Sequence, residues 1–287
     1  MSTADTRRLP VPKTHKLFIN GEFPRSESGR RYALCKPGSK HAYAQLCLGS
    51  RKDLRAAVEA AKAAQHGWAA RSAYNRGQIL YRMAEMIEGR SESWQSLLRD
   101  GLSFSAALAT RATAATIDAL VYFAGATDKY PQVIGAVNPV AGPHHNFTTP
   151  EAMGVIGMVF ADQPDPAAVA ARLAAAIAAG NSVVALLPAA CGGLVAAFGE
   201  AFATADLPAG VINLLSGDAA ELAPQFASHM EIHGLAFFRD EPATRTELQR
   251  LGVENMKRNI PANGPLLALE RVLDCVEYKT VWHPIGV

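Results

Sequence analysis

Short apolar runs alternate with longer segments of helical spacing through the second half of the chain. We predict the apolar runs as β-strands, at residues 155–160, 182–187, 211–215 and 234–238. Each run is apolar throughout, which is typical of strands that are covered on both sheet faces. We predict helices between and after them, at residues 166–179, 194–205, 219–228 and 244–252. This alternation predicts a doubly wound parallel α/β sheet, in which ligands bind at the carboxyl ends of the strands.

The first half of the chain is predicted to be mainly helical. Ser50 precedes apolar residues at i, i+3 and i+4 spacing, so we expect it to cap a helix. Further helices are predicted at residues 73–88, 91–99 and 105–129. Before them, Asn20-Gly21 separates two apolar runs within residues 17–23, which predicts a β-hairpin outside the main sheet. The proline-punctuated residues 131–150 are expected to form loop and strand.

Residues 275–283 alternate apolar and polar positions and are predicted as a strand near the end of the chain. One face of that strand would carry Val276, Tyr278, Thr280 and Trp282. A terminal strand after a linker needs an edge to pair with, and the alternatives are the hairpin at 17–23 and another protein chain. We therefore divide the chain into residues 1–258, which hold the sheet, and residues 259–287, a linker with an oligomerisation strand.

Composition and charge exclude several classes of function. With 287 residues, of which 49% are hydrophobic, the chain can bury a full core, and its net charge of +2 gives no strong field for nucleic acid or membrane. No apolar run approaches the roughly 20 residues that span a bilayer, and residues 1–13 lack the apolar core of a secretory signal. The four cysteines, at positions 35, 47, 191 and 275, have no metal-type spacing. We expect no metal, and buried free thiols in a reducing cytoplasm.

Several motifs in order carry a family resemblance. They are Gly154-Val-Ile-Gly157, Ala179-Gly-Asn-Ser-Val-Val184, Leu207-Pro-Ala-Gly-Val-Ile-Asn-Leu-Leu-Ser-Gly217 and Leu235-Ala-Phe237. Their order and spacing resemble the cofactor domain of the aldehyde dehydrogenase superfamily. Residues 74–82, 138–143, 255–258 and 278–286 look like a bacterial branch whose members are often paired with an active aldehyde dehydrogenase. They are also similar to the second, cysteine-lacking module of fused two-module aldehyde dehydrogenases.

The catalytic signals of that family are missing. A full-length member continues after the fourth strand into a catalytic domain of roughly 200 residues, more than an ordinary domain. That domain supplies a nucleophilic cysteine in a Gly-Gln-x-Cys context and a Glu-x-Phe-Gly-Pro loop. This chain passes from Arg258 to Pro265 and into the tail strand, and none of its cysteines has that context. The resemblance therefore implies a scaffold without a catalytic residue of its own.

The cofactor contacts of the family are also altered. Its Pro-Trp-Asn-Phe-Pro segment is residues 161–165 here, with Gln163 in place of the asparagine that donates to the oxyanion. Its Lys-Pro-x-Glu, which binds the adenosine ribose, is replaced by Leu186-Leu-Pro-Ala-Ala190. Its Phe-Thr-Gly-Ser turn is Phe237-Phe-Arg-Asp240, followed by Glu241. A bulky aromatic there blocks the backbone approach, and the carboxylates repel a diphosphate.

NAD binding is accordingly expected to be weak or absent. Two residues still match the family pattern and are the cofactor-binding candidates. Gly217 matches the strand-end glycine near the adenine, and Phe160 matches an apolar wall position. Both would also serve the fold without any nucleotide.

Other chemically suggestive residues have ordinary interpretations. Cys191 lies at a strand-to-helix turn, where a helix N-terminus can lower a thiol pKa, but we prefer a small buried residue beside glycines. Asp162 and Asp165 at a strand end suit acid–base chemistry, yet we prefer helix caps. The pairs His144-His145 and His229/His233 are not expected to share a face, so neither predicts a metal site.

These observations predict a non-catalytic subunit or oligomerising partner of a full-length aldehyde dehydrogenase. The expected partners are the chain itself, a full-length aldehyde dehydrogenase, or both. The alternative is an NAD-dependent oxidoreductase that acts on aldehydes with catalytic residues of its own or from a partner. A nucleotide-binding regulator is a third possibility.

Overall fold

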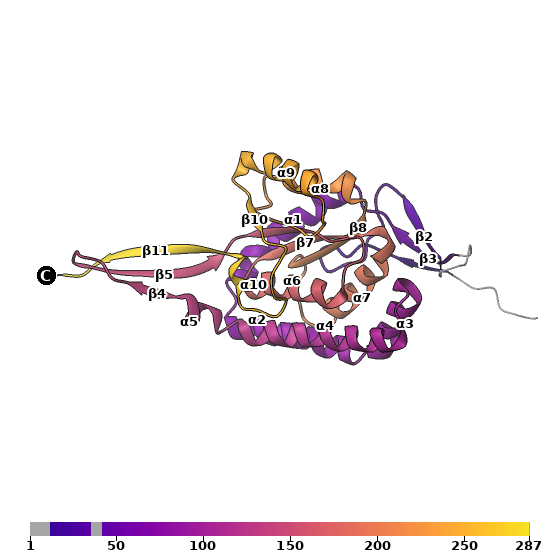
Figure 1. Ribbon diagram of the computed structural model, residues 1–287, viewed down its shortest axis with the longest axis horizontal. Helices are drawn as coiled ribbons and strands as arrows, with labels where there is room; N and C mark the ends of the chain where they lie inside the picture. The colour runs from indigo at the N-terminus through magenta and orange to yellow at the C-terminus, as the bar shows by residue number, and fades with distance from the viewer. Residues whose placement is uncertain (1–11, 36–41, 287) are drawn as a thin grey trace, which may run out of the picture.

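A five-stranded parallel sheet forms the centre of the molecule (Figure 1). The computed structural model describes residues 12–35 and 42–286. The strand order is β10-β9-β6-β7-β8. The bounds are β6 Val155–Val159, β7 Ser182–Pro188, β8 Ile212–Gly217, β9 Gly234–Phe237 and β10 Arg258–Ile260. The predicted doubly wound α/β sheet is confirmed, and β10 adds a strand that the apolar pattern did not predict.

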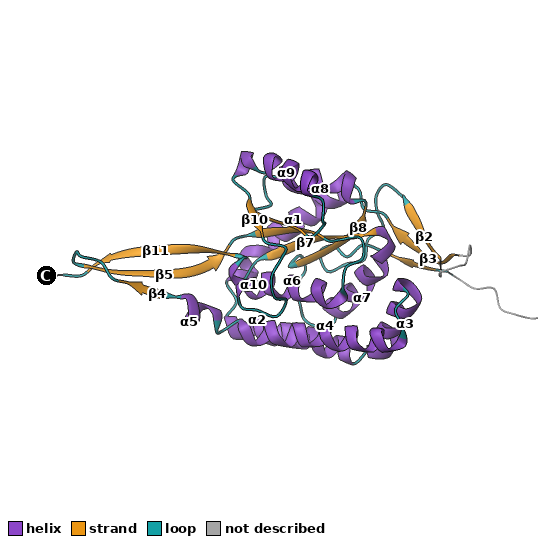
Figure 2. Ribbon diagram, viewed as in Figure 1, coloured by secondary structure: helices purple, strands orange, loops and turns teal. Residues whose placement is uncertain are grey.

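Helices cover both faces of this sheet, as the layers in Figure 2 show. The four that follow its strands are α6 (Pro166–Ala178), α7 (Gly192–Ala203), α8 (Ala219–Ser228) and α9 (Pro242–Leu251). Side chains alternate between two cores because successive strand residues point to opposite faces. On β6, Ile156 and Met158 pack with α6 and α7, while Val155 and Val159 pack with α8. The strands β6 to β9 are buried along nearly their whole length because neither of their faces meets water, whereas Arg258 and Asn259 of β10 are exposed.

The N-terminal helices begin close to their predicted positions. They are α1 (Arg51–Ala69), α2 (Ala73–Glu88), α3 (Ser91–Leu102) and α4 (Ala106–Ala126). Ser50 caps α1 as expected: its hydroxyl accepts from the Asp53 backbone N–H at 3.2 Å, and the Asp53 carboxylate accepts from the Ser50 N–H at 2.8 Å. This reciprocal pair satisfies two backbone donors that the helix cannot. None of the described helices is both long and apolar enough to cross a membrane.

The hairpin at residues 17–23 forms, but its predicted position outside the main sheet is wrong. Asn20 and Gly21 have φ angles of 54° and 74°, and Ile19 and Glu22 exchange backbone hydrogen bonds of 3.0 Å. Phe18 also exchanges backbone bonds with Leu214 of β8, at 2.9 and 2.7 Å. The hairpin therefore extends the edge of the central sheet. A separate small sheet contains β1 (Lys13–His15), β3 (Ala42–Cys47) and β2 (Arg31–Cys35), in that order.

The tail strand does not pair with the hairpin at residues 17–23 but with another strand of the same chain, and its pairing with a second protein stays a prediction. It forms β11 (Val276–Pro284), which runs antiparallel to β5 (His144–Ala152) along its whole length. The short β4 (Ala136–Asn138), preceded by α5 (Tyr130–Ile134), pairs with the other side of β5. We call the sheet β4–β5–β11 the arm, and it projects from the body at the end opposite β2 and β3 (Figure 1). Within the described chain, β11 and β4 are the open edges of the arm.

Residues 261–275 connect β10 directly to β11. The expected domain boundary after Arg258 falls inside β10. That strand hydrogen-bonds to β9 and so belongs to the central sheet. Arg172 of α6 donates to the carbonyls of Pro261 and Ala262, at 3.3 and 2.5 Å. The connection also contains α10 (Glu270–Leu273), whose Val272 is fully buried. The connection is thus anchored to the body by these contacts, with residues 263–265 exposed and Arg271, Val272 and Cys275 buried.

Candidate functional site

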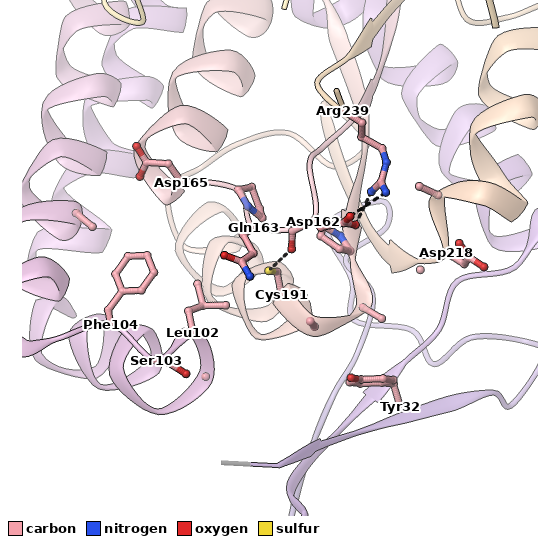
Figure 3. Close-up of a pocket in the computed structure, with 18 of the residues that line it drawn as sticks. Tyr32, Leu102, Ser103, Phe104, Asp162, Gln163, Asp165, Cys191, Asp218 and Arg239 are labelled. Carbon is pink, nitrogen blue, oxygen red and sulfur yellow. Dashed lines mark hydrogen bonds and ion pairs between the residues drawn. The ribbon is translucent and has the colours of Figure 1, made fainter. Parts of the chain in front are cut away.

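A cavity of about 1420 Å³ opens at the carboxyl ends of β6, β7, β8 and β9. Parallel α/β sheets bind ligands at this edge, so the cavity is where the fold predicts a site. The strand ends contribute Asp162, Gln163, Pro188, Gly217 and Arg239. The opposite wall is largely apolar and comes from the end of α3 and the α3–α4 connection, with Leu102 and Phe104 (Figure 3). Leu108 at the start of α4 adds to it.

An ion-pair bridge crosses one side of the cavity. The Arg239 guanidinium donates to both carboxylate oxygens of Asp162, at 2.6 and 3.0 Å (Figure 3). It also donates to Glu241 at 2.6 Å. The Arg239 side chain is 15% exposed. Its hydrogen bond with Asp162 raises the Arg239 pKa, and its hydrogen bond to Glu241 holds the pKa of that carboxyl below the usual range. The bridge ties the end of β6 to the turn that leads into α9.

The helix N-termini at the cavity already carry carboxylates of their own. Asp165 accepts from the Ala167 backbone N–H at 3.1 Å, which caps α6. Asp218 accepts from the Ala220 N–H at 2.9 Å, which caps α8. Glu241 precedes α9, whose first residue is a proline without an N–H. A carboxylate therefore already accepts from one backbone N–H at the start of α6 and of α8, and a further carboxylate precedes α9.

The charge of the lining does not suit a dinucleotide. Its ionised groups are Asp162, Asp165, Asp218, Glu241, Arg111 and Arg239. Four carboxylates face two guanidinium groups, and one of those groups is held by two of the carboxylates. No lysine lines the cavity among the described residues. A diphosphate here would meet a surplus of negative charge, so the residues present do not fit NAD well.

The two cofactor candidates occupy different environments. Gly217 lines the cavity at the end of β8, where a Cβ would lie 3.1 Å from Leu222 Cδ1 and 3.4 Å from Leu186 Cδ1. Phe160 is 4% exposed and stacks on Phe238, with ring centroids 4.9 Å apart. Packing alone explains a glycine at 217 and an aromatic at 160. Their role toward a nucleotide stays a prediction.

Cys191 is a buried, protonated thiol. It is 3% exposed, and its Sγ lies 3.7 Å from the Asp162 carbonyl oxygen. Burial, with a smaller contribution from the Asp162 charge, raises its pKa to about 11. The preferred interpretation as a small packed residue agrees with this environment. Of the four cysteines, Cys35 departs from the expected burial, since it is exposed near the end of β2.

Hydrogen bonds define the roles of Asp162 and Asp165 and of the histidines His229 and His233. The cap interpretation is confirmed for Asp165 and wrong for Asp162, which pairs with Arg239. The pair was not predicted from the sequence because its members lie far apart in the chain. The only signal was that charged residues of opposite sign replace uncharged family residues at the two strand ends. His229 and His233 accept backbone N–H bonds through Nδ1. The described residues contain no group of three or more metal-ligating side chains.

The rate of alkylation should show whether Cys191 is a protonated thiol or a nucleophilic thiolate. At pH 8, iodoacetamide is expected to modify Cys35 long before Cys191, because only the thiolate reacts. A pKa near 11 instead of 9 makes the Cys191 thiolate about a hundredfold scarcer, before burial slows its access further. Peptide mass spectrometry over time measures both sites in one sample. Cys275, fully buried with a pKa raised to about 12, serves as the unreactive reference. Equal rates at Cys191 and Cys35 would contradict this assignment.

Comparisons with known proteins agree on one family. Residues 23–262 match the sequence profile of the aldehyde dehydrogenase family. The cytosolic 10-formyltetrahydrofolate dehydrogenase of Xenopus tropicalis is 32% identical over 96% of this chain, which spans 31% of that protein. The mitochondrial aldehyde dehydrogenase family 2 member B4 of Arabidopsis thaliana is 33% identical over 77% of this chain and 41% of its own length. The chain thus spans less than half of the curated relatives that it matches.

Solved structures give the same result. A mutant aldehyde dehydrogenase from Bacillus cereus superposes with a TM-score of 0.80 and 26% identity, over 86% of this chain and 50% of that one. The NAD⁺ complex of the aldehyde dehydrogenase from the same organism superposes with a TM-score of 0.79, at the same identity and coverage.

Proposed function

The chain belongs to the aldehyde dehydrogenase family, and we propose that it is a non-catalytic subunit, a pseudoenzyme that assembles with a full-length aldehyde dehydrogenase through the arm. The direct connection between β10 and β11 carries this proposal. In the family resemblance, a catalytic domain stands between the fourth strand of the sheet and the tail strand. Here residues 261–275 fill that interval and pack on the body.

The anchoring of this connection supports a stable fold without an inserted domain. Arg271 donates to the Asn263 carbonyl at 2.8 Å and pairs with Asp274 at 2.9 Å. Asn181 donates to the Cys275 carbonyl at 2.8 Å, while its own oxygen accepts from the Gly154 N–H at 2.8 Å. These bonds join the connection to the starts of β6 and β7. The arm therefore has a rigid base on the central sheet.

The cavity supports the non-catalytic part of the proposal. Aldehyde oxidation in this family uses a thiolate nucleophile, and among the described residues that line the cavity the one cysteine is the buried, protonated Cys191. The site also has the wrong charge balance for the cofactor's diphosphate. The chain would contribute structure, and the partner would supply the chemistry. A cytoplasmic location, expected from the free thiols, is part of the same proposal.

The test is a reconstitution with a full-length aldehyde dehydrogenase from the same host. The purified chain alone should form no NADH from NAD⁺ and an aldehyde such as propanal. Mixed or co-expressed with the full-length enzyme, it should co-elute with it. Activity of the complex should vanish when the enzyme's nucleophilic cysteine is replaced by alanine, and should be unchanged by Cys191→Ala. NADH formation by the chain alone, lost on Cys191→Ala, would overturn the proposal in favour of an enzyme.

A further inference from the structure

The central strand of the arm runs into the central sheet through a junction of two residues, Met153-Gly154, which separates β5 from β6. Gly154 has a φ of 129°, a conformation that favours glycine. Its N–H donates to Asn181 Oδ1 at 2.8 Å, and its carbonyl accepts from the Ser182 N–H at 3.1 Å. The direction in which the arm leaves the body (Figure 1) therefore depends on the backbone at this junction.

His233 lies directly against the junction. A Cβ at Gly154 would lie 2.6 Å from His233 Nδ1, so the imidazole occupies space that any other residue at 154 would need. The same Nδ1 accepts from the Val155 N–H at 3.2 Å, and the His233 N–H donates to the Val155 carbonyl at 2.8 Å. Val155 is 1% exposed, so its N–H needs a partner within the protein. That partner is an unprotonated Nδ1, because a nitrogen that carries a proton cannot accept.

The groups that face His233 favour its neutral form on balance. Partial burial lowers the pKa of His233, Lys257 and Lys62 lower this pKa further, and Glu231 opposes them. Lys257 immediately precedes β10, and its ammonium donates to the His229 carbonyl at 2.9 Å. Lys62 of α1 pairs with Glu231 at 2.7 Å. The His233 side chain is exposed despite these contacts, so it can exchange protons with solvent.

We propose that protonation of His233 releases the junction, and that assembly of the arm with a full-length enzyme is therefore pH-dependent. A proton on Nδ1 would point at the Val155 N–H, and two donors cannot share this contact. The ring would turn away and leave a buried amide unpaired. Because the folded chain favours the neutral imidazole, the junction is intact above the ordinary histidine pKa of about 6.5 and is lost as the pH falls below it. The link to assembly rests on the proposed subunit role, whereas the junction belongs to this chain alone.

Hydrogen exchange of the purified chain tests the junction without any partner. After correction for intrinsic exchange rates, protection of the Val155 amide should fall roughly tenfold between pH 8 and pH 5, as expected for one lost hydrogen bond. His233→Asn places an uncharged acceptor near the position of Nδ1 and should keep the protection at both pH values. His229→Asn is the matched control, because Nδ1 of His229 accepts from the Glu231 N–H instead. In that variant the Val155 amide should respond to pH as in the wild type.

Glu231→Gln separates titration from packing. Removing the carboxylate that favours protonated His233 should move the loss of protection to lower pH, a shift that a merely structural histidine would not show. Assembly with the full-length enzyme should weaken between pH 8 and pH 5 for the wild type, and less so for His233→Asn. Val155 protection that is independent of pH in the wild type, or that falls equally in His233→Asn, would overturn the inference. A pH-dependent junction in a chain that binds no enzyme at any pH would support the junction and contradict the subunit role.

Discussion

NAD⁺ is expected to bind the purified chain roughly two to four decades more weakly than it binds a full-length family member. Two losses produce this effect. The strand end after β7 offers Pro188, Ala189 and Ala190, which have no side-chain group to bind a ribose hydroxyl. The turn before α9 offers Arg239 already paired with Asp162 and Glu241. Each lost charge-assisted hydrogen bond is worth about 1.5–3 kcal/mol.

Isothermal titration calorimetry of the chain and of a full-length enzyme under the same conditions measures this difference. Ala190→Phe provides a site control, because Ala190 is exposed and lines the cavity after β7. If residual binding uses this cavity, the variant should abolish it. A low-micromolar dissociation constant for the wild type would show that the charge argument is wrong.

Truncation of the chain after Glu277 is expected to abolish assembly with the full-length enzyme. The truncation removes Tyr278 and Trp282, which are 54% and 59% exposed on one face of β11. Buried aromatic anchors at interfaces are worth about 2 kcal/mol each or more, so the loss amounts to roughly three decades in affinity. Val276 remains in place to anchor the connection, since it is only 6% exposed.

Size exclusion with light scattering measures the assembly, and circular dichroism confirms that the central sheet stays folded. Tyr278→Ser and Lys279→Ser form a matched pair, because neighbouring residues of a strand point to opposite faces. Tyr278→Ser should weaken the complex far more than Lys279→Ser, whose ammonium pairs with Glu151 on the surface. A truncated chain that still co-elutes with the enzyme would refute the role of the arm.

Local patterns predicted the central sheet well because its strands and helices carry their own signals. Continuous apolar runs identified β6 to β9, and α2 and α8 begin and end at the predicted residues. The three-residue β10 has no such run, and it became visible only through its pairing with β9. The partner of β11 was missed for a similar reason. The alternation of apolar and polar residues fixes which side chains share a face of β11. The pairing with β5 instead depends on residues that lie more than 120 positions away in the chain.

The sequence identified where the site departs from the family pattern, but not which of its residues contact one another. Sequence comparison with the family pattern located Gln163, the missing lysine and the altered turn, and all of them fall on the cavity or its strand ends. The Arg239 bridge required the folded positions of two strand ends. Several family-like residues proved to hold the fold: Asn213 accepts from the Asn20 N–H at 2.9 Å and donates to the Gly210 carbonyl at 2.7 Å. Residues of these motifs therefore serve the architecture of the fold.

The short connection between β10 and β11 also bears on how such a chain could arise. The entropy lost when a flexible link is closed grows with the logarithm of its length, so residues 261–275 close the arm at a cost about 2 kcal/mol lower than a flexible link of roughly 200 residues. Excising a domain at this position would leave the arm more firmly tethered, because Arg172 and Asn181 hold the remaining segment. A gene that lost a domain at this position in one deletion could therefore still encode a folded chain.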